Sequence, residues 1–107
     1  MPIKTVEHPF ELENELAHNK NTIVMFSASW CEPCRIIKPV FERFSNYTKY
    51  ENIGFVHVDI DDADQISIDY KITSVPTFIM FVDGVVYERL NGANTATLEK
   101  LLDDRLV

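Results

Sequence analysis

Cysteine is scarce in this sequence, and long apolar runs are missing. Among the 107 residues there are two cysteines, Cys31 and Cys34, so disulfides cannot join distant segments as they do in small secreted domains. No stretch approaches the roughly 20 apolar residues that a membrane helix needs, and no apolar signal-peptide segment follows Met1. These absences exclude a disulfide-stapled secreted scaffold and a membrane span, and they predict a cytoplasmic protein.

Basic residues are outnumbered as well. Ten Lys and Arg against 17 Asp and Glu give a formal net charge of −7, which argues against nucleic acid as a partner and favours basic or neutral protein surfaces. The sequence is 46% hydrophobic and 25% charged, as expected for a folded globular chain. The length suits one domain over residues 1–107, without repeats or linkers, and we expect a monomer.

Apolar periodicity predicts an alternation of strands and helices. Strands are predicted over residues 3–6, 22–26, 53–60, 77–82 and 85–87, and helices over residues 8–19, 33–50, 61–70 and from 95 toward the C-terminus. Asp83-Gly84 is a two-residue hairpin turn between the last two strands. The order βαβαβαββα predicts an α/β fold with a central mixed five-stranded sheet flanked by helices, because strand–helix–strand units form parallel crossovers and a hairpin adds an antiparallel edge.

Helix caps and apolar faces follow from the same pattern. Asp61 and Asp62 are expected to cap the third helix and Thr95 the last one. Pro39 should kink the second helix, because its ring lacks an N–H and meets the carbonyl four residues back. The apolar faces of the second and last helices are predicted to consist of Ile36, Ile37, Val40, Phe41 and Phe44, and of Leu98, Leu101, Leu102 and Leu106.

The two cysteines form a Cys-x-x-Cys pair where a buried strand gives way to a helix. The N-terminus of a helix stabilises an anion, and the thiolate is the reactive form of cysteine, so this placement predicts Cys31 as a nucleophile. Cys34 lies about one turn further along and can resolve a mixed disulfide formed at Cys31. We expect Cys34 to be the more buried of the two. Pro33 between them suits the first turn of a helix.

Other interpretations of the pair are a zinc site, inert core cysteines and a binding module. A closed zinc site needs four ligands, and His8, His18 and His57 have unsuitable spacing, so no metal site is expected. Inert core cysteines do not fit the neighbouring residues, which are typical of a surface turn: Trp30, Glu32, Pro33 and Arg35. A binding module that retains the pair stays open.

The segment Phe26-Ser-Ala-Ser-Trp-Cys-Glu-Pro-Cys-Arg35 resembles the active-site segment of the thioredoxin family. The similarity extends along the whole chain, with comparable motifs at Val58–Asp61, Val75–Phe78, Asp83-Gly84 and Asn91–Ala93. The resemblance implies a thioredoxin fold and the reduction of protein disulfides by Cys31 and Cys34.

The resemblance also implies a docking surface for substrate. Pro76 would follow a cis peptide bond and face the cysteine pair, and the backbone of Val75 would pair with an extended substrate segment. Together the docking surface would comprise Trp30, Pro33, Val75, Pro76, Gly92 and Ala93.

Electron supply follows from the same resemblance. No bound cofactor is expected, because the cysteine pair carries the electrons, which would come from NADPH through a flavin-containing thioredoxin reductase. The other partners would be disulfide-containing proteins such as peroxiredoxins or reductases.

Met25 departs from the family's pattern. Thioredoxins usually carry a buried aspartate at this position, where it helps the inner cysteine lose its proton. His57 and Asp59 lie on the next strand and share one face by period-2 alternation. The imidazole of His57 is suited to accept the proton in place of the aspartate, because its ordinary pKa is near 6.5. A histidine that is merely satisfied by backbone groups is the open alternative.

Glu32 is the second departure, because thioredoxins usually have glycine at this position. Its carboxylate should disfavour the Cys31 thiolate slightly and make the protein a slightly stronger reductant. Met25 and Glu32 together favour an alternative function, that of a thioredoxin-like binding subunit or chaperone with weak redox activity.

Overall fold

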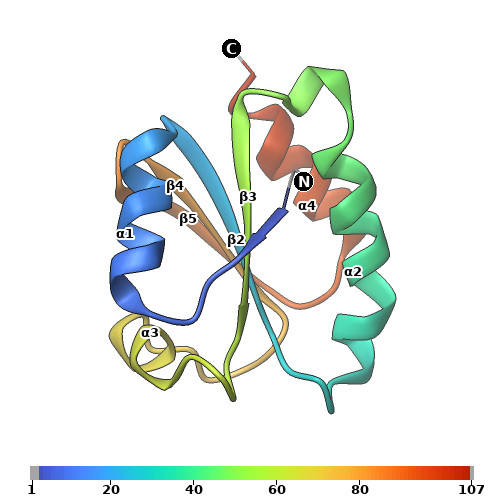
Figure 1. Cartoon of the computed structure of the whole chain (residues 1–107). Helices are drawn as coiled ribbons and strands as arrows, with labels where there is room; N and C mark the ends of the chain where they lie inside the picture. The colour runs from blue at the N-terminus through green and yellow to red at the C-terminus, as the bar shows by residue number, and fades with distance from the viewer. Residues whose placement is uncertain (1–2, 107) are drawn as a thin grey trace.

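A five-stranded sheet lies between two pairs of helices (Figure 1). The computed structural model describes residues 3–106. Along the chain the elements are β1 (Ile3–Thr5), α1 (Pro9–His18), β2 (Asn21–Ser27), α2 (Glu32–Ser45), a 3-10 turn (Thr48–Tyr50), β3 (Ile53–Asp59), α3 (Asp64–Asp69), β4 (Thr77–Val82), β5 (Val85–Asn91) and α4 (Thr95–Asp103). The predicted α/β fold and the element order are confirmed.

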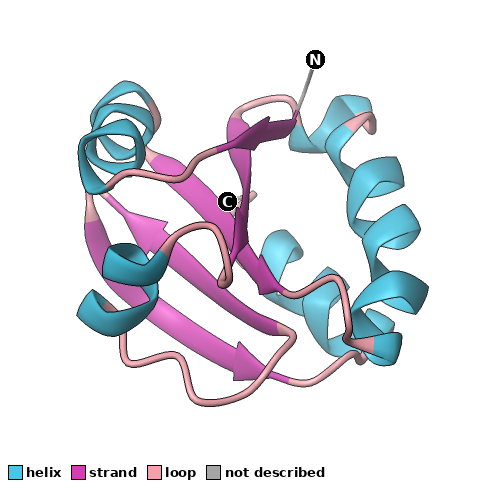
Figure 2. Ribbon diagram, turned by 60° about the horizontal axis from the view of Figure 1, so that its bottom comes forward, coloured by secondary structure: helices cyan, strands magenta, loops and turns pink. Residues whose placement is uncertain are grey.

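Strand β2 is the centre of the sheet, whose strand order is β1-β3-β2-β4-β5. It pairs in parallel with β3 and antiparallel with β4, so the sheet is mixed, as predicted. Its residues from Thr22 to Ser27 are all buried, because helices cover both faces of the sheet (Figure 2). The unbroken apolar run in the sequence is the consequence of this position.

Two cores separate the sheet from its helices. Since successive side chains of a strand point to opposite faces, Ile23 and Met25 pack toward α2 and α4, whereas Val24 and Phe26 pack toward α1 and α3. Cys34 belongs to the first of these cores. The inner cysteine is therefore in the same apolar layer as the centre of β2.

Helix α2 differs from the prediction at its end and on its surface. It ends at Ser45 rather than near Tyr50, because the backbone N–H groups of Asn46 and Tyr47 turn back to carbonyls three residues earlier and close the helix. Ile36 is 68% exposed, so its inclusion in the apolar face is wrong. The helix continues through Pro39.

The predicted caps of α3 and α4 are wrong by one or two residues. Asp59 accepts a hydrogen bond from the backbone N–H of Asp61 at 2.8 Å, so the segment before α3 forms a turn and the helix begins only after Ala63. Asn94 caps α4, because its side chain accepts from the N–H of Thr97 at 2.9 Å. Leu106 lies beyond α4 and is 43% exposed.

The hairpin turn is confirmed, but its second strand is longer than predicted. Asp83 and Gly84 have φ values of 53° and 79°, which a two-residue turn of this hand requires. Strand β5 continues to Asn91, opposite Thr77 at the start of β4. Among residues 3–106, no helix combines the length and the apolar character needed to cross a bilayer.

Candidate active site

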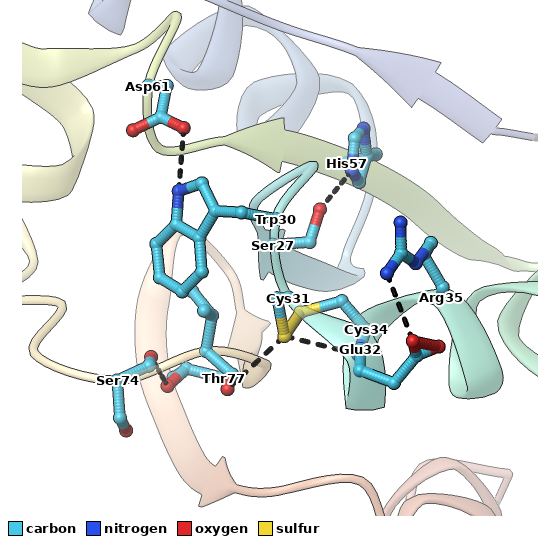
Figure 3. The surroundings of a disulfide bond; sticks show 11 residues. Ser27, Trp30, Cys31, Glu32, Cys34, Arg35, His57, Asp61, Ser74 and Thr77 are labelled. Carbon is cyan, nitrogen blue, oxygen red and sulfur yellow. Dashed lines mark hydrogen bonds and ion pairs between the residues drawn. A yellow bond between two sulfur atoms is a disulfide. The ribbon is translucent and has the colours of Figure 1, made fainter.

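Cys31 and Cys34 are joined by a disulfide at the start of α2, with their Cα atoms 5.3 Å apart (Figure 3). Cys31 is the N-cap of the helix. The two residues are 4% and 3% exposed, so Cys34 is the more buried of the two by a margin too small to separate their roles in the oxidised form. What distinguishes them is their surroundings, since Cys31 adjoins the loop before β4, whereas Cys34 faces into the fold.

The sulfur of Cys31 lies where backbone groups can stabilise a negative charge. The backbone N–H of Cys34, one of the N–H groups at the helix start that have no partner within the helix, donates to Cys31 Sγ at 3.2 Å. In the reduced protein the same N–H and the positive end of the helix favour the thiolate. This geometry supports the role predicted for Cys31.

The loop before β4 brings the expected docking residues to the disulfide. The Val75–Pro76 peptide bond is cis, as the resemblance implied. Cys31 Sγ is 3.6 Å from the carbonyl oxygen of Val75, and the N–H of Gly92 donates to the carbonyl of Pro76 at 2.9 Å. Gly92 has a φ of 99°, a conformation that favours glycine. Val75, Pro76 and Gly92 thus lie side by side, and the exposed Ala93 follows directly.

Trp30 is 65% exposed beside the cysteine pair, as a surface turn requires. Its Nε1–H donates to a carboxylate oxygen of Asp61 at 3.0 Å (Figure 3). Asp61 was not predicted from the sequence as this partner. The contact could have been suspected from the topology, because the loops after the neighbouring parallel strands β2 and β3 begin at the same end of the sheet.

Glu32 forms an ion pair with Arg35 one turn along α2, with 3.0 Å between the carboxylate and the guanidinium. Both side chains are more than half exposed. Glu32 was expected to act as a single negative charge, although the i,i+3 spacing on a helix is a signal for such a pair. The positive charge of Arg35 therefore offsets the effect predicted for Glu32 at the neighbouring sulfur.

A pocket of about 290 Å³ lies behind the disulfide. Met25 is fully buried in the core that contains Cys34, so a thioether occupies the place at which the family usually has a carboxylate. The pocket is lined by residues that include Ser27, Cys34, Lys38, His57 and Asp59. The structure thus brings the predicted residues His57 and Asp59 together with the inner cysteine.

His57 is only 7% exposed and makes a side-chain contact that the sequence analysis missed. Its Nε2 lies 2.6 Å from the hydroxyl oxygen of Ser27 (Figure 3). Burial, assisted by the charge of Lys38, lowers the pKa of His57 to about 4, against a smaller opposing effect of Asp59. The imidazole is therefore neutral near pH 7. The signal for Ser27 was a polar residue directly after the apolar run Ile23–Phe26, two residues after Met25, which pairs with His57 in the β2–β3 register.

The zinc interpretation has no support in the part of the chain that the structure describes. Within residues 3–106, no group of three or more His, Cys, Asp or Glu side chains could hold a metal ion. His18 ends α1 and its Nδ1 lies 2.7 Å from the carbonyl oxygen of Asn14. Since α1 and α2 cover opposite faces of the sheet, His18 cannot join the cysteines at one site.

Comparison with known proteins agrees with the fold and the cysteine pair. The family model described as Thioredoxin matches residues 3–104. Thioredoxin-3 of Dictyostelium discoideum is 45% identical over 93 residues, which cover 87% of this chain and 86% of that protein. The thioredoxin of Malassezia sympodialis superposes with a TM-score of 0.92 at 28% identity, covering 100% of this chain and 96% of that one.

A second similar structure comes from work on the thiol-resolving mechanism of yeast mitochondrial 1-Cys peroxiredoxin via glutathione/thioredoxin systems. Its matching chain has a TM-score of 0.88 at 28% identity, and the match covers 95% of this chain and 94% of that one. Fold, sequence and the position of the cysteine pair thus agree along nearly the whole length. The chain belongs to the thioredoxin family.

Proposed function

We propose that the protein reduces disulfide bonds of other proteins, with Cys31 as the attacking and Cys34 as the resolving cysteine. The observation that carries this proposal is the Cys31–Cys34 disulfide at the start of α2, beside the exposed Trp30 and the cis Val75–Pro76 bond. As a member of the thioredoxin family the chain is a thiol–disulfide oxidoreductase. Membership also implies disulfide-bearing substrates and a reductase that restores the dithiol.

The reaction proceeds by two exchanges. The Cys31 thiolate attacks one sulfur of the substrate disulfide, which forms a mixed disulfide and releases the first substrate thiolate. Cys34 then loses its proton and attacks Cys31 Sγ, which releases the second substrate thiolate and leaves the Cys31–Cys34 disulfide. Two electrons pass from the cysteine pair to the substrate, and the two thiolates take up protons. The reductase returns two electrons to the pair.

Substrates would dock on the surface around Cys31. We propose that an extended segment pairs with the backbone of Val75, as a strand added at a free edge. Such a position would place the substrate's sulfur near Cys31, whose Sγ lies 3.6 Å from Val75 O. The other contacts would come from residues close to Cys31 or Val75 in sequence and from Gly92, which is hydrogen-bonded to Pro76, with its neighbour Ala93. The residues near in sequence are Trp30, Pro33 and Pro76.

The second exchange requires a proton acceptor for Cys34, and His57 is the proposed group. It lines the same pocket as Cys34. Its imidazole is neutral near pH 7 and therefore has one unprotonated ring nitrogen. Ser27 occupies Nε2, and Asp59 at the same pocket counteracts the lowering of the pKa of His57. A base with a pKa of about 4 accepts a thiol proton weakly. The contribution of His57 should accordingly be modest.

Electrons for the next cycle would come from NADPH through a flavin-containing thioredoxin reductase. We propose that residues 1–107 act as one monomeric domain in the cytoplasm. Peroxiredoxins are one substrate class to test, since a similar chain comes from work on the resolution of a yeast mitochondrial 1-Cys peroxiredoxin.

The deciding experiment is the reduction of insulin with NADPH and a thioredoxin reductase. We expect turnover with the wild-type chain and none with the Cys31→Ser/Cys34→Ser double variant. The competing function, a thioredoxin-like binding subunit or chaperone with weak redox activity, is favoured by the absence of a carboxylate at Met25. It predicts that the wild type gives little more reduction than the double variant, while both bind unfolded insulin chains equally.

A further inference from the structure

The loop that carries Val75 and Pro76 is held at its beginning by a side chain of β5. This loop connects the end of α3 to β4. The guanidinium of Arg89 donates from Nη1 to the carbonyl of Tyr70 and from Nη2 to the carbonyl of Lys71, the latter at 2.8 Å. Both carbonyls lie at the C-terminal end of α3, where carbonyl groups lack partners within the helix.

The end of the same loop is held by Asn91, which lies two residues after Arg89 in β5 and on the same face of the strand. The hydroxyl of Thr77 donates to the carbonyl of Ser74 at 2.8 Å and lies 3.1 Å from the side-chain amide of Asn91. The single hydroxyl hydrogen of Thr77 is thus shared between the carbonyl oxygen of Ser74 and Oδ1 of Asn91. The neighbouring N–H of Gly92 donates to Pro76 O at 2.9 Å.

Arg89 and Asn91 lie on one face of an edge strand, since they are two residues apart in β5. They stand opposite Ile79 and Thr77 of β4. Between the two anchored ends, the loop presents the carbonyl of Val75, which is 3.6 Å from Cys31 Sγ. The position of this carbonyl relative to the sulfur is thus fixed from β5, by residues that do not touch the disulfide.

We propose that Arg89 and Asn91 are positioning residues that hold Val75 where a docked protein segment can pair with it while its disulfide meets Cys31. This inference rests on the proposed docking of protein disulfides at Val75. Pairing and attack must occur in one geometry, so a small shift of the loop slows reaction with a protein disulfide. A small aromatic disulfide reacts with Cys31 without pairing to the loop and is less sensitive to that shift.

The test compares two disulfides with the reduced protein in single-turnover experiments that need no reductase. The second-order rate constants are measured for insulin and for 5,5′-dithiobis(2-nitrobenzoate), and their ratio is compared among variants. We expect Arg89→Met to lower the insulin-to-small-disulfide ratio about tenfold and Asn91→Ala to lower it about threefold. Arg89→Lys should restore only part of the ratio, because an ammonium lacks the planar fork that reaches two carbonyls.

Arg105→Met is the matched control. Arg105 also donates to a side chain, that of Asn21 at 2.9 Å, and packs on Tyr87, but its contacts are at the other end of the sheet. The ratio should be that of the wild type. A wild-type ratio in Arg89→Met and Asn91→Ala, or an equal loss with both disulfides, would overturn the inference even if the variants unfold more easily. Failure of the wild type to reduce insulin at all would instead overturn the proposed function.

Discussion

The hydroxyl oxygen of Ser27 lies 2.6 Å from Nε2 of His57, on two neighbouring parallel strands behind Cys34. The contact joins the end of β2 to β3 and occupies one of the two ring nitrogens. It lies at the pocket that Cys34 also lines, so a neutral imidazole is one of the polar groups behind the inner cysteine, together with the carboxylate of Asp59. We therefore expect this arrangement to affect the rate at which Cys34 resolves the mixed disulfide.

The roles of the two cysteines can be separated by trapping. In Cys34→Ser the mixed disulfide at Cys31 cannot be resolved, so we expect a stable covalent complex with a protein disulfide substrate. Cys31→Ser should give no such complex and no turnover. Non-reducing gels and mass spectrometry identify the linked cysteine. A complex linked through Cys34 in Cys31→Ser would reverse the assignment.

His57→Ala should slow the resolution of the mixed disulfide several-fold, about two- to fivefold, because a weak base is lost. The ratio of the wild-type to the variant rate should stay constant from pH 6 to 8, because the lowered pKa keeps His57 neutral over this range. Release of the second substrate thiol in rapid mixing measures the step. Met25→Asp in the His57→Ala background should recover part of the rate.

Ser27→Ala is the control for this experiment, because it retains the imidazole and removes only its hydrogen-bond partner. A resolution rate that is the same in the wild type and in His57→Ala at every pH would show that His57 takes no part in proton transfer. In that case the histidine is a buried structural residue.

The buried His57 should also make stability depend on pH in a defined window. Its pKa is lowered from 6.5 to about 4 in the folded protein, so the unfolded chain binds a proton that the folded chain does not. The contribution of His57 to the free energy of unfolding is complete above pH 6.5 and is lost as the pH falls toward 4. We expect the free energy of unfolding to drop by about 2 to 3 kcal/mol more in the wild type than in His57→Gln across this window.

Urea unfolding of both proteins at several pH values measures this difference. The carboxylates are the same in both chains, so their contribution cancels in the comparison. Lys38 and Asp59 act on the same imidazole with opposite sign, and Lys38→Met should narrow the window by raising the pKa of His57. Parallel pH curves for the wild type and His57→Gln would contradict the prediction.

The ion pair between Glu32 and Arg35 predicts a small effect of Glu32 on the redox potential. Glu32→Gln should make the potential less negative by less than about 10 mV, because the 3.0 Å pair already offsets much of the negative charge near Cys31. Arg35→Gln leaves Glu32 without its partner and should shift the potential in the opposite direction. Equilibration with glutathione at low salt measures both. A shift well above 10 mV in Glu32→Gln would mean that Arg35 does not offset the charge in solution.

The centre of the fold and the position of the cysteine pair could be predicted because their signals are local. The apolar run of β2 reports burial on both faces, and Asp83-Gly84 contains the two residue types that the hairpin turn needs. The helix that begins at the cysteine pair follows directly from the strand before it. Each of these features is determined by residues adjacent in sequence.

The contacts that complete the site could not be predicted, because they join segments far apart in sequence. Ser27 and His57 are 30 residues apart, and Trp30 and Asp61 are 31 apart. Both contacts depend on the register between β2 and β3, which periodicity does not give. The caps failed for a different reason, since Asn94 and Thr95 are both capping residue types and only the backbone conformation decides between them.

Met25 has a consequence beyond catalysis. A fully buried thioether at the centre of the sheet never has to be taken out of water as an ion, whereas an ionised carboxylate at the same depth would be penalised by several kcal/mol. The chain thus lacks an internal base at this position and has instead an apolar side chain that packs in the core beneath α2 and α4. Many enzymes make the opposite exchange, sacrificing robustness for speed. This reductant should be slower than one with the acid in place, and harder to denature.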